Sequence, residues 1–169
     1  MPRLFALLFI ISASIAMTGC NEVNSDRIPY ADVYVDLTYN WNIYGVHSMG
    51  EYKYFIRSND LAKREPRDFP FNANTRTGFG GLLLTCDAEN HPLVYDLACP
   101  FERKSNIIVR VLPDNSNVVE CPQCHSRYNV TEFFGSAIDG PAKTHRYGLT
   151  RYNAYPNQAS LTTGYTLRR

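Results

Sequence analysis

The chain has 169 residues, of which 44% are hydrophobic and 20% are charged. This length corresponds to one domain, and the apolar fraction is sufficient for a packed core. Lys and Arg total 17 against 16 Asp and Glu, and such a balance argues against a nucleic-acid-binding protein, which needs a basic surface. The aromatic content of 13%, with ten Gly and ten Pro, favours an ordered, turn-rich chain over a disordered one.

The first 19 residues have the composition of an export signal. Arg3 supplies a positive charge, and residues 4–15 form an apolar stretch that is too short to span a bilayer comfortably. Residues 17–19 then lead into Cys20. This arrangement resembles a bacterial lipoprotein signal, in which the cysteine is acylated and becomes the first residue of the mature chain. The alternative is an ordinary signal peptide followed by an incidental cysteine.

The residues after Cys20 bear on where such a lipoprotein would reside. Asn21 and Glu22 follow it, with no aspartate immediately after the cysteine. By resemblance to Gram-negative lipoproteins, this pattern implies a cell-envelope protein held in the outer membrane through the lipid on Cys20. Residues 20–28 are predicted to be a lipidated polar tether, and residues 29–169 a single domain.

The remainder of the chain shows the alternation of β-strands. Val33, Val35 and Leu37 alternate with polar or aromatic residues, which is typical of a half-buried strand. Further apolar or β-branched segments predict strands at residues 52–56, 82–84, 93–95, 107–112 and 118–119. A charged segment with two prolines predicts a loop over residues 60–70. Because no stretch has sustained helical periodicity, we expect an all-β fold, an antiparallel sandwich or open barrel.

Two short cysteine loops each follow a predicted strand. The first is Cys99-Pro100-Phe101-Glu102, and the second begins at Cys121 with Cys-Pro-Gln-Cys-His. Such loops at strand ends can present several thiolates to one metal centre. The candidate metal ligands are Cys99, Cys121, Cys124 and His125.

Over residues 78–154 the sequence resembles a Rieske-type domain, in which two cysteines and two histidines on two loops hold a [2Fe–2S] cluster. The shared features are a glycine-rich strand entry, the two loops, a Ser-x-Tyr after the second loop and a later Gly-Pro-Ala. The resemblance implies a Rieske-like β domain with a two-loop subdomain at about residues 96–145. It also implies that Ser126 and Tyr128 donate hydrogen bonds around the cluster and that Pro141 covers the same end of the domain.

The ligand positions depart from the Rieske pattern. In this respect the sequence most resembles the divergent Rieske-like lipoproteins of Bacteroidetes. Phe101 occupies the first histidine position, Cys124 the second, and His125 stands where the family has glycine. We therefore expect a structural or interaction module without a cofactor, and not an enzyme. One alternative is a periplasmic electron-transfer protein that binds [2Fe–2S] through Cys99, Cys121, Cys124 and also His125. The same residues could bind zinc instead, or Cys121 and Cys124 could form a disulfide.

The other cysteines and histidines are weaker candidates. Cys86 is predicted to be a buried thiol in a strand, far from the two loops. His47, His91 and His145 lie in polar, turn-like segments, where histidine is usually a surface residue. The sequence contains no pattern that identifies a protein partner.

Overall fold

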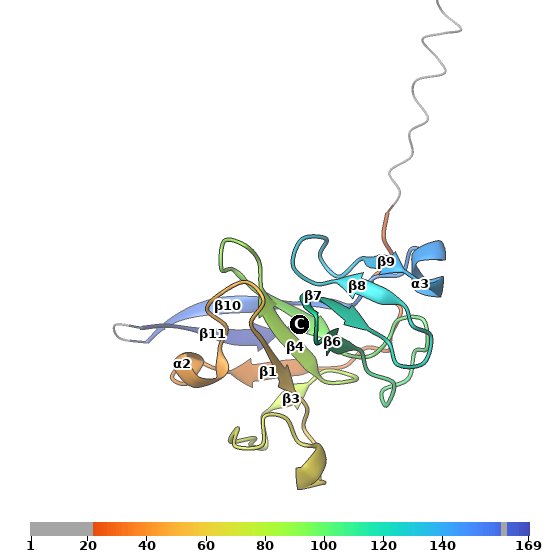
Figure 1. The fold of residues 1–169 in the computed structure, drawn as a ribbon. Coiled ribbons are helices and arrows are strands. Elements are labelled where there is room, and N and C mark those ends of the chain that lie inside the picture. The colour runs from red at the N-terminus through yellow and green to blue at the C-terminus, as the bar shows by residue number, and fades with distance from the viewer. Residues whose placement is uncertain (1–21, 160–161) are drawn as a thin grey trace, which may run out of the picture.

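The computed structural model describes residues 22–159 and 162–169, and it is built mainly from β-strands (Figure 1). The strands are β1 (Val33–Asp36), β2 (Tyr52–Phe55), β3 (Arg76–Thr77), β4 (Leu82–Cys86), β5 (Pro92–Asp96), β6 (Arg110–Leu112), β7 (Asn115–Glu120), β8 (Arg127–Asn129), β9 (Ala137–Asp139), β10 (Arg151–Ala159) and β11 (Thr162–Arg168). The short helices of the described residues are α2 (Trp41–Tyr44), η1 (Leu61–Lys63) and α3 (Pro141–Thr144). The predicted all-β class is confirmed. No helix among the described residues is long and apolar enough to cross a membrane.

The strands form two antiparallel sheets. The larger sheet has seven strands in the order β2-β4-β5-β10-β11-β1-β3 and is nearly closed, while the smaller has the order β6-β7-β8-β9. This agrees with the expected open-barrel or sandwich architecture. We call residues 99–150, which contain the smaller sheet and α3, the loop lobe.

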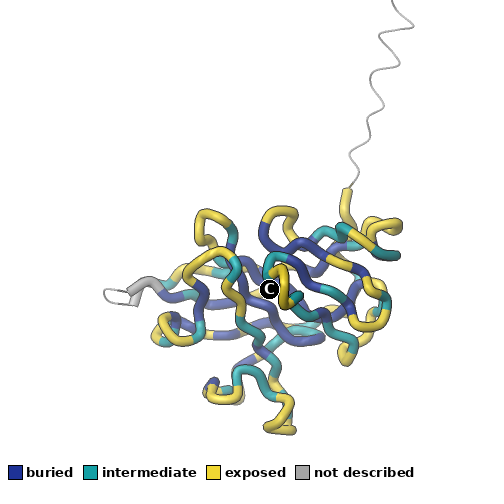
Figure 2. Tube along the Cα trace, in the orientation of Figure 1, coloured by how far each residue is buried: buried dark blue, intermediate teal, exposed yellow. Residues whose placement is uncertain are grey.

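Strands β4 and β5 are buried on both faces, and this explains their uninterrupted apolar sequence. Leu82, Leu84 and Cys86 face the core inside the larger sheet, beside Trp41. Leu83 faces the opposite way, into a second core shared with the loop lobe. Figure 2 shows the resulting buried band through the centre of the molecule, with exposed loops at its periphery. Successive residues of a strand point to opposite faces, so only a sheet covered on both sides requires apolar residues throughout.

Asp96 anchors the end of β5 just before the first cysteine loop. Its buried carboxylate accepts hydrogen bonds from the backbone N–H groups of Phe79 (2.7 Å), Gly80 (2.9 Å) and Ala98 (2.8 Å). It also accepts one from the Tyr152 hydroxyl, at 2.9 Å. These bonds connect the glycine-rich turn that precedes β4 with two strands, β5 and β10. They thereby fix where the chain enters the first loop.

The structure contains regular elements that the sequence patterns did not predict. The long hairpin of β10 and β11 extends beyond residues 78–154, and its strands pair from Asn153 with Arg168 to Ala159 with Thr162. Strand β7 begins at Asn115 rather than at residue 118, so the β6–β7 connection is shorter than expected. Both segments are rich in polar residues, which weakens the alternation on which strand prediction depends.

The predicted tether is only partly free of the domain. The backbone N–H of Asn24 donates to the carbonyl of Arg146, and Gly148 N–H donates to the carbonyl of Asn24, each at 2.9 Å. Ile28 is buried. The chain is therefore packed on the loop lobe from Asn24 onward, and the expected tether of residues 20–28 is shortened accordingly. Residues 1–21, including Cys20, lie outside the described residues.

The Asp96 contacts predict a large loss of stability in Asp96→Ala, because four donors would lose their shared acceptor inside the protein. We expect the free energy of unfolding in urea to fall by about 4 kcal/mol, and by about 1.5 kcal/mol in Tyr152→Phe. The matched control is Tyr155→Phe, on the exposed side of β10. Equal stabilities of Tyr152→Phe and Tyr155→Phe would contradict the role of this carboxylate.

Candidate metal centre

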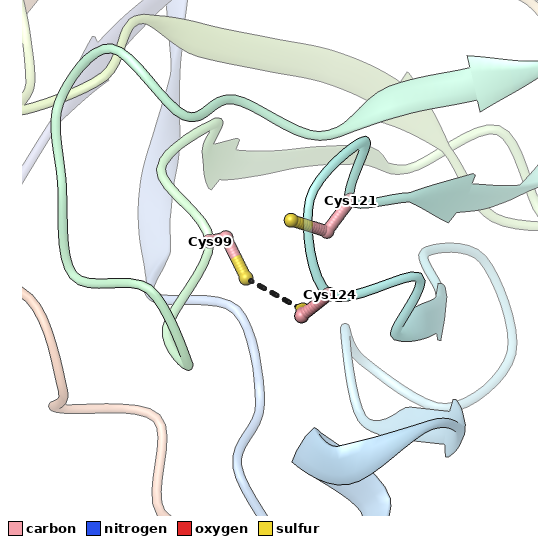
Figure 3. Close-up of side chains that lie close together, drawn as sticks. All are labelled: Cys99, Cys121 and Cys124. Carbon is pink, nitrogen blue, oxygen red and sulfur yellow. Dashed lines mark hydrogen bonds between the residues drawn. The ribbon is translucent and has the colours of Figure 1, made fainter.

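Three cysteine thiols from the two predicted loops lie together at one end of the loop lobe. Cys99 follows β5, Cys121 immediately follows β7, and Cys124 lies in the turn between β7 and β8. Their Sγ atoms all lie within 4.8 Å of one another, and those of Cys99 and Cys124 are 3.6 Å apart. Figure 3 shows the three side chains directed into the same space. The structure thus brings together the three predicted cysteine ligands.

Both loops have the same local conformation. The N–H of Arg103 donates to the carbonyl of Cys99 (2.8 Å), and the N–H of His125 donates to that of Cys121 (3.0 Å). Arg103 and His125 each have positive φ, 57° and 54°. Each loop is therefore a single turn that a left-handed residue closes four positions after its first cysteine. The proline after each cysteine favours this turn because its φ is already restricted.

A hydrogen bond between side chains joins the two loops. Gln123 Nε2 donates to Glu102 Oε2 at 2.8 Å. Nothing in the local sequence pattern relates positions 102 and 123 to each other, so the sequence does not predict this pair. The bond lies on the exposed side of the loops and holds their tips in register.

Two hydroxyl groups lie beside the thiols, but Ser126 accepts a hydrogen bond from the Cys124 thiol, whereas the Rieske resemblance implies that it donates one. The Tyr128 hydroxyl lies 3.5 Å from the Sγ of Cys99, and Ser126 Oγ lies 3.3 Å from the Sγ of Cys124. Ser126 Oγ also accepts a hydrogen bond from the N–H of Ala142 in α3, at 3.0 Å. Helix α3 begins at Pro141, so Pro141 lies at the end of the domain that holds the thiols.

The Cys99 thiol is strongly acidic in this environment. Hydrogen bonds from the Cys121 thiol, the Tyr128 hydroxyl and the backbone N–H groups of Glu102 and Phe101 lower the pKa of Cys99 to about 5, although burial opposes this shift. The same contact raises the pKa of the Cys121 thiol, since Cys121 then retains the shared proton beside a thiolate. At neutral pH Cys99 is therefore a thiolate, which is the form that binds metal ions.

His125 does not join the three cysteines. Its side chain is 74% exposed, and its Nδ1 lies 3.2 Å from Oε1 of Glu120. The other carboxylate oxygen of Glu120, Oε2, accepts a hydrogen bond from Arg127 at 2.7 Å. The left-handed backbone of His125 turns its side chain away from the thiols. The proximity of His125 to Cys124 in the sequence predicts a metal ligand, but the turn geometry directs the imidazole to the surface.

Cys86 is separate from the three thiols. It is fully buried at the end of β4, in the core on the other face of the larger sheet. Burial raises the pKa of its thiol to about 11, so Cys86 is uncharged at neutral pH. All four described cysteines are free thiols, and no disulfide links Cys121 to Cys124 in this structure.

A second group of potential ligands lies at the β4–β5 turn and has a structural explanation. Asp87, Glu89 and His91 bring their side chains within 4.8 Å of one another. Asp87 Oδ1 accepts hydrogen bonds from the N–H groups of Glu89 and His91, which is the usual way in which aspartate closes a turn.

An aromatic stack that the sequence did not predict supports the first loop. The ring of Phe101 lies 6.0 Å from that of His145, which stacks on Tyr147 at 5.3 Å, and the guanidinium of Arg27 lies 4.3 Å from the Tyr147 centroid. Phe101 thus packs against a neighbouring segment at the position where the Rieske pattern has a histidine.

No protein-family model, no curated protein and no solved structure matches this chain.

The acidity of Cys99 predicts a pH-dependent stability in the metal-free, reduced protein. The folded thiol ionises near pH 5 and the ordinary value is 9.0, so between these limits the unfolded chain binds more protons. The stabilisation is complete above about pH 9 and is lost as the pH falls through about 5. Urea unfolding at pH 6, 7 and 8 should give a steeper rise in stability for the wild type than for Cys99→Ser. Parallel pH profiles would contradict this assignment.

Proposed function

We propose that Cys99, Cys121 and Cys124 bind a single thiolate-preferring metal ion, zinc in the first instance. The observation that carries this proposal is the convergence of three Sγ atoms within 4.8 Å, with one pair 3.6 Å apart. Zn–S bonds of about 2.3 Å in a tetrahedron place neighbouring sulfurs about 3.8 Å apart, so the thiols fit one such ion with little movement. A water molecule or an external donor would complete the coordination.

The same geometry supports a structural role for the ion. Cys99 and Cys121 are fully buried in the core that joins the two sheets, so a metal ion there would crosslink two loops and stabilise the loop lobe. The protein would then be a zinc-stapled interaction module with a Rieske-like arrangement of loops, and not an enzyme.

Electron transfer through a [2Fe–2S] cluster is the second candidate function. It is favoured by the Tyr128 hydroxyl beside the sulfur of Cys99, because a hydroxyl donor at a cysteine sulfur raises the potential of an iron–sulfur cluster. A two-iron cluster divides its four ligands between two irons, whereas these three thiols surround one point. The fourth ligand would be His125, which would have to leave Glu120.

Membrane attachment through Cys20 completes the proposed function. The proposal is supported by the apolar leader and the small residues that precede this cysteine. A single acyl chain binds a membrane weakly, so stable attachment in the outer membrane requires the several chains of a bacterial lipoprotein.

The metal proposal predicts that the reduced, chelator-treated protein binds one Zn²⁺ or Co²⁺ per chain. Co²⁺ should give thiolate-to-metal charge-transfer absorption, and zinc at about 100 times its dissociation constant should raise the free energy of unfolding by about 2.7 kcal/mol. Single replacement of Cys99, Cys121 or Cys124 by Ser should weaken binding at least about 100-fold, since each removes one of three protein ligands.

Two variants serve as controls for metal binding. His125→Ala and Cys86→Ala should bind metal as the wild type does, because neither side chain lies at the site. Two irons and two sulfides per chain in protein matured in a bacterial envelope would support the cluster instead. A Cys121–Cys124 disulfide in that protein would contradict both metal proposals.

The lipid proposal predicts that the full-length protein incorporates labelled palmitate and partitions into detergent when it is expressed in a Gram-negative host. Cys20→Ala should abolish labelling, because no other cysteine follows an export signal. Cys124→Ser is the matched control and should be labelled like the wild type. An unlabelled, freely soluble wild-type protein would refute the anchor.

A further inference from the structure

We propose that the β8–β9 loop is a membrane-contact surface that enters the lipid headgroup region beside the anchor. This inference rests on the proposed lipidation of Cys20. We call the side chains concerned the phenylalanine surface; they are Glu132, Phe133, Phe134, Ser136, Ala137, Ile138 and Lys143. Phe133 and Phe134 are 57% and 59% exposed.

The length of chain between the anchor and the domain limits how far this surface can lie from the bilayer. Asn24 is already paired with the loop lobe, through its N–H to Arg146 and its carbonyl to Gly148. Only three residues lie between Cys20 and Asn24, so their Cα atoms are at most about 14 Å apart in a fully extended chain. The lipid headgroup region is itself about 5–8 Å thick, so the face that carries Asn24 must lie against the membrane.

The β8–β9 loop belongs to that face. Ser136 forms a β-bridge with Gly148, and the N–H of Leu149 donates to the carbonyl of Gly135 at 2.9 Å. Val23 packs on Gly148, where an added Cβ would lie 2.8 Å from its Cγ1. Phe134 is the immediate neighbour of Gly135. In Figure 1 the beginning of the described chain lies beside β9 and α3.

The loop holds its phenylalanines outward in a fixed turn. Asn129 Oδ1 accepts hydrogen bonds from the N–H groups of Thr131 (3.1 Å) and Glu132 (2.8 Å), and Ser136 N–H donates to the carbonyl of Phe133 at 3.0 Å. Phe134 has a φ of 50°, which is unfavourable for an aromatic residue. Two exposed aromatic side chains on a strained but well-bonded turn indicate a use for the exposed surface.

The charges around the phenylalanine surface suit a headgroup layer. Lys143 lines it, and the guanidinium of Arg151 lies 4.9 Å from the ring centre of Phe134. The one acidic residue that lines the surface is Glu132. Aromatic rings with neighbouring basic groups are typical of protein segments that lie in the membrane interface. A bilayer containing anionic lipid is therefore the occupant that we assign to this surface.

The experiment uses full-length, lipidated protein reconstituted into phosphatidylethanolamine–phosphatidylglycerol vesicles whose acyl chains are brominated near the headgroup. The tryptophan fluorescence that Phe134→Trp adds to that of the wild type should be at least about halved in brominated vesicles compared with unbrominated ones. The reason is that bromine quenches only nearby indoles. Phe133→Trp provides a second probe if the first variant does not fold. The control is Tyr39→Trp, which replaces an 85% exposed residue next to α2 and should not be quenched.

The outcomes separate this inference from the anchor on which it rests. Lipidated protein that floats with the vesicles but shows equal quenching at positions 134 and 39 overturns the membrane-contact surface alone. Pairing of the loop with a second copy of the chain or with another protein would overturn it as well. Absence of lipid on Cys20 by mass spectrometry overturns both the anchor and the contact surface.

Discussion

The thiols of Cys99 and Cys121 belong to the hydrophobic core that joins the two sheets, and much of the structure depends on this. They pack with Leu83, Tyr95 and Val119, which come from both sheets. The core excludes water from one side of the thiols, while Cys124 remains partly exposed on the other. Occupation of the proposed metal centre would therefore be coupled to the packing of the two sheets.

This arrangement has an electrostatic cost that the loops offset. A buried thiolate is unfavourable unless hydrogen bonds compensate its charge. Here the donors to Cys99 are the protonated thiol of Cys121, the Tyr128 hydroxyl and backbone N–H groups of its own loop. Because each donor is fixed by the fold, the charge is stabilised before any ligand binds, which lowers the reorganisation that metal binding requires.

The loop lobe also connects the thiols to the beginning of the domain. Ser126, which lies beside Cys124, is bonded by Ala142 of α3, and the segment that follows α3 pairs with Asn24. Gly140 permits this close packing, since an added Cβ there would lie 2.7 Å from the Cα of Ser126, and its φ is 77°. With the proposed anchor at Cys20, the thiol site would lie on the lobe nearest the membrane.

Local sequence patterns were sufficient to predict the all-β class, several central strands and the two cysteine loops. Apolar alternation and the uninterrupted run of β4 are local consequences of burial, and Cys-Pro turns are local consequences of restricted φ. The exclusion of His125, the bond between Glu102 and Gln123 and the stacking of Phe101 emerged only from the folded chain. Each depends on the direction of a side chain at a turn or on segments distant in sequence, and residue spacing carries no information about either. The pairing of Asn24 with the loop lobe is of the same kind, because a polar segment acquires its partners from the surface on which it packs.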